Sequence, residues 1–392
     1  MSKYLRIAIL TFFMLGVTSL LASERSFLLN GLDSKVQISK PGKIDFVEPG
    51  EDILNILDIS DPANPKLAAN LLLSNSLFGP PTNLQINPEE SLALVTSAMK
   101  WEQKNDDWKP APDNRLFIID LEKNKPALID TVEVGMQPSG IAISSSGRFA
   151  LIANRADRSV SVVSINGKTA RLSQTVPVND EVAAVAITPD ERRALIVKNS
   201  SNKIGVLSIN DSHVTYDASY DMPVGQFPYN IDISPDGSYA VVAHTGNNGY
   251  SDGHADSLVV IRLDNGSRPF VENYFTAGDA PEGFAISPRG DIAIALLLGG
   301  DSILPTSHWA HNKTGQIVVF KTNNGNLQQI QKISITGLPE GIAFSGNGDY
   351  VYVSSFREKV LRVYQVDGEF LIDTETRIEL PGTPASMRGR AR

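Results

Sequence analysis

The sequence predicts an all-β protein, a seven-bladed β-propeller whose blades are four-stranded antiparallel sheets. Three observations lead to this fold. One motif recurs along the chain at steps of 44 to 58 residues. Each copy alternates apolar runs of strand length with polar turns. The 392 residues include no cysteine and 42% of them are hydrophobic, so the packing of an extended core must hold the fold together without disulfides.

The repeat is clearest in five consecutive units, and a more divergent copy precedes them. The five units begin at Gln137, Glu181, Phe227, Ala280 and Leu338, and the divergent copy begins at Pro80. A proline stands near the start of each unit except the one that begins at Glu181, where Val182 takes its place. Repeats of this length are typical of propeller blades.

Each unit predicts four strands in the same order. The first is a short alternating run such as "GIAIS", and it ends at a Ser-Pro-Asp-Gly turn, in which proline presets φ and glycine tolerates a positive φ. An apolar second strand such as "YAVVAH" follows, and a loop separates it from a β-branched third strand such as "SVSVVSI". A polar turn and a more polar fourth strand complete the unit.

Six units and the two ends of the chain together make seven blades. The segment "RIELPGTPASMRGR" repeats the beginning of a unit, with Pro384 at the position of the recurring proline. The segment "GKIDFVEPGEDILNILDIS" supplies the second and third strands that this unit lacks. We therefore expect the two ends to share one blade, which removes the free sheet edges. Residues 24–392 then form a single domain.

Residues 1–23 are predicted to be a signal peptide. Lys3 and Arg6 precede the apolar run Ile7–Ala22, and the small residues Ala22 and Ser23 follow it. This run is shorter than the roughly 20 residues of a membrane-spanning helix. We expect a bacterial protein, periplasmic or secreted, with no membrane span once the signal is cleaved. An uncleaved anchor is the alternative.

The repeats resemble the YVTN-type family of lactonase-like seven-bladed propellers. The stretches "PSGIAISSSGRFALIANRADRSVSVVSI", "PYNIDISPDGSYAVVAH" and "PEGIAFSGNGDYVYVSS" carry the resemblance, which extends over roughly Phe27 to Arg388. It implies the propeller fold but no single function, because the family includes lactone-cyclising and lactone-hydrolysing enzymes, surface-layer proteins, a DNA-binding protein and scaffolds. No catalytic residue of the family maps onto a position of this chain.

Three units are longer than the others because of insertions between their second and third strands. The insertions are Met99–Arg115, His244–Ser257 and Asp301–Gly315. In an up-and-down blade this loop emerges on the face where the chain enters the innermost strand, and insertions on one face often form a binding surface. The predicted ligand- or partner-binding residues are aromatic and cationic side chains of this rim. They are Trp101, Trp108, Arg155, Tyr229, Trp309 and Arg357. The alternative is that the tryptophans only cover the ends of blades.

The same insertions contain candidate metal ligands. "DGHAD" places alternate residues on one side of an extended segment, and "HWAH" offers two imidazoles from one loop. Imidazole and carboxylate together suit a divalent ion such as zinc or manganese. The candidates are His244, Asp252, His254, Asp256, His308 and His311. No established metal-binding spacing is present, so solvated loop histidines are the favoured alternative and no cofactor is certain.

Glu282 and Glu340 are the candidate catalytic residues. Each stands in a "PEG" motif at the start of the first strand of adjacent units, which places both at the mouth of the central channel. Two neighbouring carboxyl groups could bind a cation or act as general acid and general base. The alternative is that they are ordinary polar residues of the rim. The sequence contains no GxSxG, GxGxxG or P-loop motif in a suitable context.

Three functions remain open. The first is a non-enzymatic binding or interaction scaffold, which would engage a small polar ligand or a protein partner at the decorated rim. The alternative is a lactonase-like or metal-assisted hydrolase or isomerase with its site at the channel mouth. The third is binding of single-stranded nucleic acid, which the formal net charge of −9 disfavours. We expect a monomer.

Overall fold

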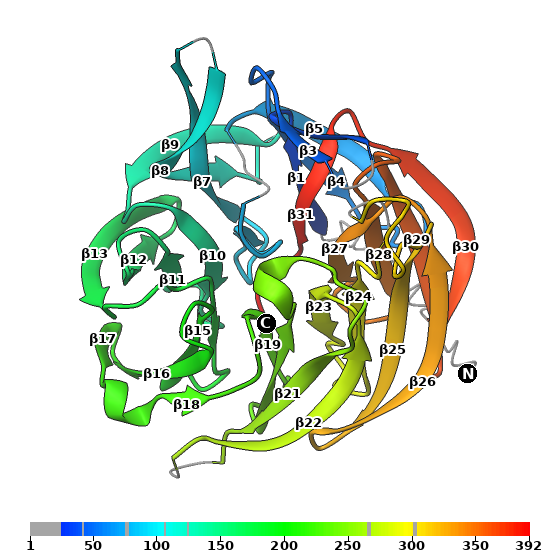
Figure 1. The fold of residues 1–392 in the computed structure, drawn as a ribbon. Coiled ribbons are helices and arrows are strands. Elements are labelled where there is room, and N and C mark those ends of the chain that lie inside the picture. The colour runs from blue at the N-terminus through cyan, green and yellow to red at the C-terminus, as the bar shows by residue number, and fades with distance from the viewer. Residues whose placement is uncertain are drawn as a thin grey trace, which may run out of the picture.

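The computed structural model describes residues 25–40, 43–74, 78–105, 107–123, 125–264, 268–300 and 304–392. Seven antiparallel sheets, each built on four strands, surround one axis (Figure 1). The predicted fold class, a seven-bladed β-propeller, is therefore confirmed. The predicted signal peptide lies outside the described residues. Within the described ranges, no helix is long and apolar enough to cross a membrane.

The ends of the chain share blade 1, as predicted. Its strands, from the axis outward, are β31 (Thr383–Arg388), β1 (Phe27–Asp33), β4 (Ile53–Asp58) and β5 (Lys66–Leu72). Strand β31 pairs antiparallel with β1, with Thr383 opposite Asp33 and Arg388 opposite Leu29. The ring is thus closed by hydrogen bonds between segments more than 300 residues apart in the sequence.

One part of the blade 1 prediction was wrong. The segment Lys43–Phe46 is not the second strand of the blade but forms β3, which pairs with β2 (Val36–Lys40) in a hairpin inserted between β1 and β4. The true second strand is Phe27–Asp33, and all of its residues are buried. A strand buried on both faces shows no alternation of apolar and polar residues, so the periodicity of the sequence did not reveal it.

The other blades follow in chain order. Blade 2 consists of β6 (Leu84–Ile86), β7 (Leu92–Lys104), β8 (Asp107–Asp120) and β9 (Ala127–Glu133). Blade 3 consists of β10 (Pro138–Ile143), β11 (Phe149–Asn154), β12 (Ser159–Asn166) and β13 (Thr169–Pro177). Blade 4 consists of β14 (Ala184–Ile187), β15 (Arg193–Lys198), β16 (Lys203–Asn210) and β17 (His213–Tyr216), and the short β18 (Met222–Pro223) also pairs with β16.

Blade 5 consists of β19 (Pro228–Ile233), β20 (Tyr239–His244), β21 (Asp256–Arg262) and β22 (Phe270–Gly278). Blade 6 consists of β23 (Pro281–Ile286), β24 (Ile292–Leu297), β25 (Gly315–Asn323) and β26 (Asn326–Ile335). Blade 7 consists of β27 (Pro339–Phe344), β28 (Tyr350–Ser355), β29 (Val360–Asp367) and β30 (Phe370–Glu379). Two short 3-10 helices, η1 (Ala218–Tyr220) and η2 (Asn247–Gly249), lie in loops.

The hydrophobic core lies between neighbouring blades. Leu151 and Val162 of blade 3, for example, belong to one buried cluster with Ile196 and Leu207 of blade 4. The second strands are buried along their whole length in several blades, as in β11 and β20, whereas the outermost strands alternate between exposed and partly buried residues. Each pair of blades therefore shares one apolar layer, and the repeat pattern of the sequence reflects these shared layers.

The predicted turns connect the first and second strands of the blades, on the face that we call the turn face. In the turn of blade 5, the Gly237 N–H donates to the Ser234 carbonyl at 2.8 Å, and Gly237 has a φ of 71°. Glu191 takes the glycine position in blade 4 with a φ of 56°, and its carboxylate accepts a hydrogen bond of 2.8 Å from the Ser145 hydroxyl of blade 3. The residue that replaces glycine thus links two blades.

The opposite face, where the chain enters each innermost strand, carries the insertions, and we call it the insertion face. Four residues that directly precede a recurring proline have left-handed backbone conformations. They are Gln137, Phe227, Ala280 and Leu338, with φ angles of 47° to 62°. Residues other than glycine rarely adopt these angles. The carbonyl of each accepts an N–H of the residue that follows the second strand of the same blade, at 2.8 to 3.1 Å, which fixes the turn toward the axis.

The innermost strands pack so closely that some positions exclude a side chain. A Cβ atom on Gly283 of β23 would lie 2.5 Å from the carbonyl oxygen of Glu340 on β27. A Cβ atom on Gly140 of β10 would lie 2.7 Å from the Cα of Ala184 on β14. The glycine of each "PSG" and "PEG" motif is therefore required by contact between blades, because real Cβ atoms do not approach the backbone so closely.

We expect Gly283→Ala to lower the free energy of unfolding by about 1–3 kcal/mol, because the added methyl group forces two innermost strands apart. Urea-induced unfolding of the two proteins measures this difference. The control is Gly50→Ala, in which the new Cβ would meet the side chain of Ser34 at an ordinary 3.4 Å. Equal stability of the two variants would contradict the packing constraint.

Candidate functional site

The long loops share the insertion face, as predicted, and the structure adds a fourth one. Strands β7 and β8 extend as a hairpin in which Gln103 pairs with Trp108, and this hairpin projects from the ring (Figure 1). The second loop contains η2 and joins β20 to β21, and the third joins β24 to β25. The hairpin β2–β3 is the fourth insertion. It was missed because its strand β3 had been predicted as the second strand of blade 1.

Trp101 covers the β2–β3 insertion. Its ring lies 6.1 Å from that of Phe46 and 5.9 Å from that of Phe78, and the Lys35 ammonium is 5.4 Å from the Trp101 ring. Lys35 is buried and forms an ion pair with Asp52. Trp101 therefore belongs to the packing that shields this ion pair, which supports the alternative of a structural cover. Trp108 is half-buried on the projecting hairpin.

Trp309 is the most exposed aromatic residue among the described residues of the insertion face, ahead of Tyr250 and Phe46. Its side chain is 72% exposed, and its ring lies 5.9 Å from His254 and 5.8 Å from His308. The two histidines come from insertions of adjacent blades, so the contact joins two loops. Arg357 is also exposed, at the end of β28 in blade 7. These residues do not converge with Trp101.

Several of the predicted metal ligands hold their own loops in place. Nδ1 of the buried His244 lies 3.3 Å from the Ser257 carbonyl, and burial lowers the pKa of this imidazole to about 4, which keeps it neutral. His308 Nδ1 accepts the Ala310 N–H at 3.2 Å. His311 Nδ1 lies 3.0 Å from the carbonyl oxygen of Leu304.

The acidic candidates are also held within their loop. Asp256 accepts the Ala280 N–H at 2.9 Å, and burial raises the pKa of its carboxyl group to about 6. Asp252 lies 3.2 Å from Nδ1 of His254. Among the residues that the structure describes, no group of three or more histidine, aspartate or glutamate side chains is arranged to hold a metal ion. The six predicted metal ligands are thus not brought together.

The predicted catalytic carboxyl groups do come together at the channel mouth. Glu282 and Glu340 begin β23 and β27 in the neighbouring blades 6 and 7. Each lies in a shift of strand register, between Pro281 and Phe284 in one blade and between Pro339 and Ile342 in the other. Such β-bulges redirect side chains. The carboxyl groups interact electrostatically across the blade boundary.

Tyr229 and Arg155 complete the group at the channel mouth. The Tyr229 hydroxyl donates a hydrogen bond to the Glu282 carboxylate and accepts the N–H of Gly79. The ring of Phe227 stacks on that of Tyr229 at 6.1 Å. The charge of Arg155 acts on Tyr229, which places the guanidinium group near the same cluster. Four of the eight residues predicted as catalytic or binding therefore lie at one site.

The electrostatics of the channel mouth favour one proton on the pair Glu282 and Glu340 near neutral pH. Burial raises the pKa of the Glu282 carboxyl group to about 7, while the hydrogen bond from Tyr229 opposes that rise. Burial and the negative charge of Glu282 raise the pKa of Glu340 well above its ordinary range. Glu340 is 4% exposed, and its Oε2 makes no hydrogen bond to any described residue. Near neutral pH, Glu340 thus holds a proton while Glu282 exchanges one.

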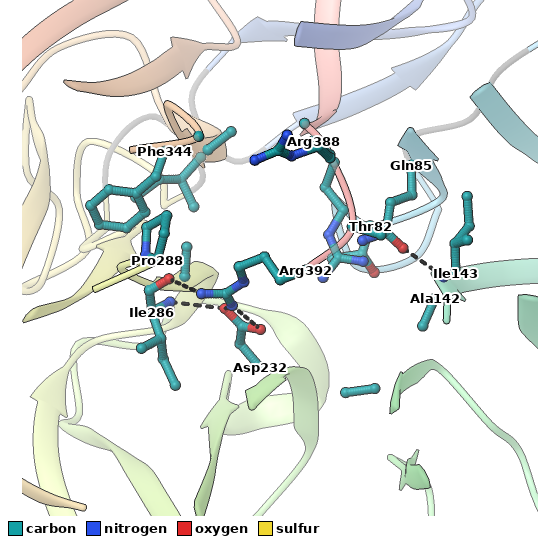
Figure 2. A pocket seen from close by; sticks show the side chains of 18 of the residues that line it. Thr82, Gln85, Ala142, Ile143, Asp232, Ile286, Pro288, Phe344, Arg388 and Arg392 are labelled. Carbon is teal, nitrogen blue, oxygen red and sulfur yellow. Dashed lines mark hydrogen bonds and ion pairs between the residues drawn. The ribbon is translucent and has the colours of Figure 1, made fainter. Parts of the chain in front are cut away.

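At its other end the channel widens into a cavity of about 520 Å³ that opens on the turn face (Figure 2). The segment after β31 runs beside β6, where the Ile86 N–H donates to the Gly389 carbonyl at 3.2 Å and the Ala391 N–H donates to the Ile86 carbonyl at 2.8 Å. Arg392 then reaches across the channel, and its Nη2 lies 2.7 Å from both carboxylate oxygens of Asp232.

The cavity was not predicted from the sequence. The repeat pattern ends with β31, so the residues beyond it had no expected position. The alternating arginines of "RGRAR" (388–392) were the one available signal, since alternate residues of an extended segment share a side.

Comparison with known proteins supports the fold. The chain matches no protein-family model and no curated protein. A periplasmic gluconolactonase of Pseudomonas aeruginosa is 19% identical with a TM-score of 0.65, over 92% of this chain and 99% of that one. A Bacteroides uniformis protein proposed to be a 6-phosphogluconolactonase is 18% identical with a TM-score of 0.68, over 93% and 99%. Hydrazine synthase of Kuenenia stuttgartiensis is 18% identical with a TM-score of 0.60, over 80% and 90%.

These structures have unlike functions, and at such identities the similarity shows the propeller fold alone.

The raised pKa of Glu282 predicts a pH dependence of stability. An acid whose pKa is higher in the folded state stabilises the fold fully below the unfolded pKa of about 4.5, and this stability is lost as the pH rises toward 7. We expect the free energy of unfolding to fall by about 2–3 kcal/mol over this interval in the native protein, and by less in Glu282→Gln. Urea unfolding at pH 4.5 and 7.5 measures both values. Glu379→Gln, on the exposed outer strand, is the control, and parallel behaviour of all three proteins would contradict the assignment.

Proposed function

We propose that the protein hydrolyses a small lactone at the channel mouth, with Glu282 as general base and Glu340 as general acid. The observation that carries this proposal is the pair of carboxyl groups on adjacent blades, Glu340 buried and Glu282 partly buried, of which one retains its proton near neutral pH. General acid–base chemistry needs one group in each protonation state, held at the same place.

The reaction opens a cyclic ester with one water molecule. The Glu282 carboxylate removes a proton from water while the water oxygen forms a bond to the ester carbonyl carbon. The tetrahedral intermediate then loses its ring oxygen, and Glu340 donates its proton to that oxygen as the carbon–oxygen bond breaks. The product is a hydroxy acid. The pair of glutamates still holds one proton, which moves from Glu282 back to Glu340 and restores the starting state.

Tyr229 and Arg155 support these steps. The hydrogen bond from the Tyr229 hydroxyl stabilises the Glu282 carboxylate and so keeps its pKa from rising as far as burial alone would take it. A general base is most effective when its pKa is near the working pH. A large fraction of it is then deprotonated, and it still has a high affinity for the proton. The positive charge of Arg155 near this cluster favours the negative charge that develops on the carbonyl oxygen.

The comparisons are compatible with this chemistry. The propellers of similar structure include a gluconolactonase and a protein proposed to be a 6-phosphogluconolactonase. Membership of the YVTN-type family, which the repeats resemble, remains part of the proposal. The sequence analysis predicted a small polar ligand, and in this proposal that ligand is the lactone substrate.

The test measures the hydrolysis of glucono-δ-lactone and of a five-membered lactone through the acid that each reaction releases. The rate with the protein is compared with the spontaneous rate of hydrolysis. We expect Glu282→Gln and Glu340→Gln each to lower kcat/KM about 100-fold or more, because general acid–base groups contribute at least that much. His308→Ala is the control, since its ring holds its own loop. No acceleration by the folded protein with either lactone, or equal rates in the glutamate variants, would refute the proposal.

Export is the second part of the proposed function. The signal-peptide pattern of residues 1–23 supports action in the periplasm or outside the cell. We expect the protein expressed from its full sequence in a bacterium to appear in the periplasmic or culture fraction, with a mass that lacks this segment. A full-length mass in the cytoplasmic or membrane fraction would rule out this localisation.

Partner binding at the insertion face is the second candidate function, and the exposure of Trp309 favours it. Large exposed aromatic side chains are common at the centres of interfaces. The test compares recovery of proteins from a periplasmic extract on the native protein and on Trp309→Ala. Equal recovery would remove this candidate, whereas loss of one defined partner would support it.

A further inference from the structure

The cavity at the turn face carries an uncompensated positive charge, although the protein as a whole is acidic. Its charged lining residues are Asp232, Arg388, Arg390 and Arg392. Arg392 pairs with Asp232 through two contacts of 2.7 Å. Arg390 is exposed and lies 3.7 Å from Glu90. Among the described residues, Arg388 is therefore the arginine of the cavity that forms no ion pair with a carboxylate.

Arg388 extends from β31 across the neighbouring innermost strand β6. Its Nη1 donates to the Ile141 carbonyl of β10 at 2.9 Å, the single hydrogen bond of this side chain within the part of the chain that the structure describes. Burial lowers the pKa of the guanidinium group, which means that desolvation opposes its charge. Arg388 is partly exposed, and the charge of Asp232 offsets only part of this cost, so an anion directly beside the guanidinium group would relieve it further.

Two further polar side chains, Gln85 and Thr82, line the same cavity. Oε1 of Gln85 accepts the Ile143 N–H at 2.8 Å, which fixes the amide while its donor, Nε2, takes no part in this bond. Thr82 is 6% exposed, and its Oγ1 has no partner in the described structure. Both residues line the cavity, and Figure 2 shows them at its wall with Arg388.

Strand β10 brings these three residues together. The Ile141 carbonyl accepts from Arg388, and the Ile141 N–H donates to the Thr82 carbonyl at 3.0 Å. The Ile143 N–H, two residues along, donates to Gln85. The guanidinium group of Arg388 and the amide of Gln85 are therefore both anchored to one short strand. This preorganisation is the arrangement that binding sites require.

We propose that the turn-face cavity is a binding site for a small organic carboxylate, held by Arg388 with the help of Gln85. A planar guanidinium group offers two parallel N–H donors that match the two oxygens of a carboxylate. Gln85 Nε2 can donate to the same anion. This site is separate from the channel mouth, because neither Glu282 nor Glu340 lines the cavity.

The remainder of the cavity indicates the body of the ligand. Apolar side chains form much of the opposite wall, among them Ala186, Ile233, Ile286 and Phe344. A volume of about 520 Å³ is within the usual range for small-molecule sites. The walls therefore favour an organic acid with an apolar portion over inorganic phosphate, and the single unpaired cation favours one negative charge.

The experiment measures binding of benzoate and hexanoate to the full protein by isothermal titration calorimetry. Benzamide and hexanamide are the neutral counterparts, and inorganic phosphate is the alternative anion. We expect both carboxylates to bind at least ~10-fold more tightly than their amides, since charged hydrogen bonds to a partly buried guanidinium group contribute about that factor or more. Arg388→Gln should weaken carboxylate binding at least ~10-fold, whereas Arg171→Gln, which removes an exposed cation from the outermost strand of blade 3, should leave it unchanged.

A second variant protects the test against misfolding of Arg388→Gln. Gln85→Glu keeps an oxygen to accept the Ile143 N–H but replaces the Nε2 donor by a negative charge, so it should also weaken carboxylate binding. The proposal is overturned if the native protein binds neither carboxylate at millimolar concentration, if the amides bind equally well, or if carboxylate binding persists in both variants. Tighter binding of phosphate than of either carboxylate would likewise overturn the proposed ligand class.

Discussion

The convergence of seven innermost strands on one axis is the constraint on which the rest of the structure depends. At Gly140 and Gly283 the strands approach too closely for any side chain, so polar groups near the axis bond to the backbone of the next blade. The Ile286 N–H donates to Asp232 of blade 5, and the Ile143 N–H donates to Gln85 of blade 2. The Glu340 carboxyl group is one of the polar groups that stay without such a bond at its Oε2 among the described residues.

The two ends of the channel differ in charge because of where each side chain stands on its strand. The residue after the recurring proline lies at the insertion face, and in blades 6 and 7 it is Glu282 or Glu340. The residues at the end of β31 lie at the turn face, and they are arginines. The channel therefore has an acidic mouth and a basic far end within a protein of net charge −9. A regular scaffold thus supports two chemically different sites.

The periodicity of the sequence predicted the features that recur at equivalent positions of the repeat. The turn glycines, the ring closure through β31 and the meeting of Glu282 with Glu340 all follow from equivalent positions in successive units. Features outside the repeat were not predictable. Strand β1 is buried on both faces and shows no alternation, so the β2–β3 hairpin was misplaced. The loop histidines contact backbone groups of their own loops, and no sequence pattern predicts such contacts. The segment beyond β31 has no equivalent in the other units.

The proximity of the two sites has a physical consequence that links them. Tyr229 of the mouth and Asp232 of the basic end lie three residues apart on β19, so roughly 10 Å of extended strand separates the two levels. A lactone is neutral and responds weakly to the charges of the channel. Its hydrolysis product is a carboxylate, which ionised Glu282 repels and Arg388 attracts over this distance, because charges in a poorly solvated channel are little screened. If both proposed sites operate, the reaction itself creates the charge that favours release from the mouth.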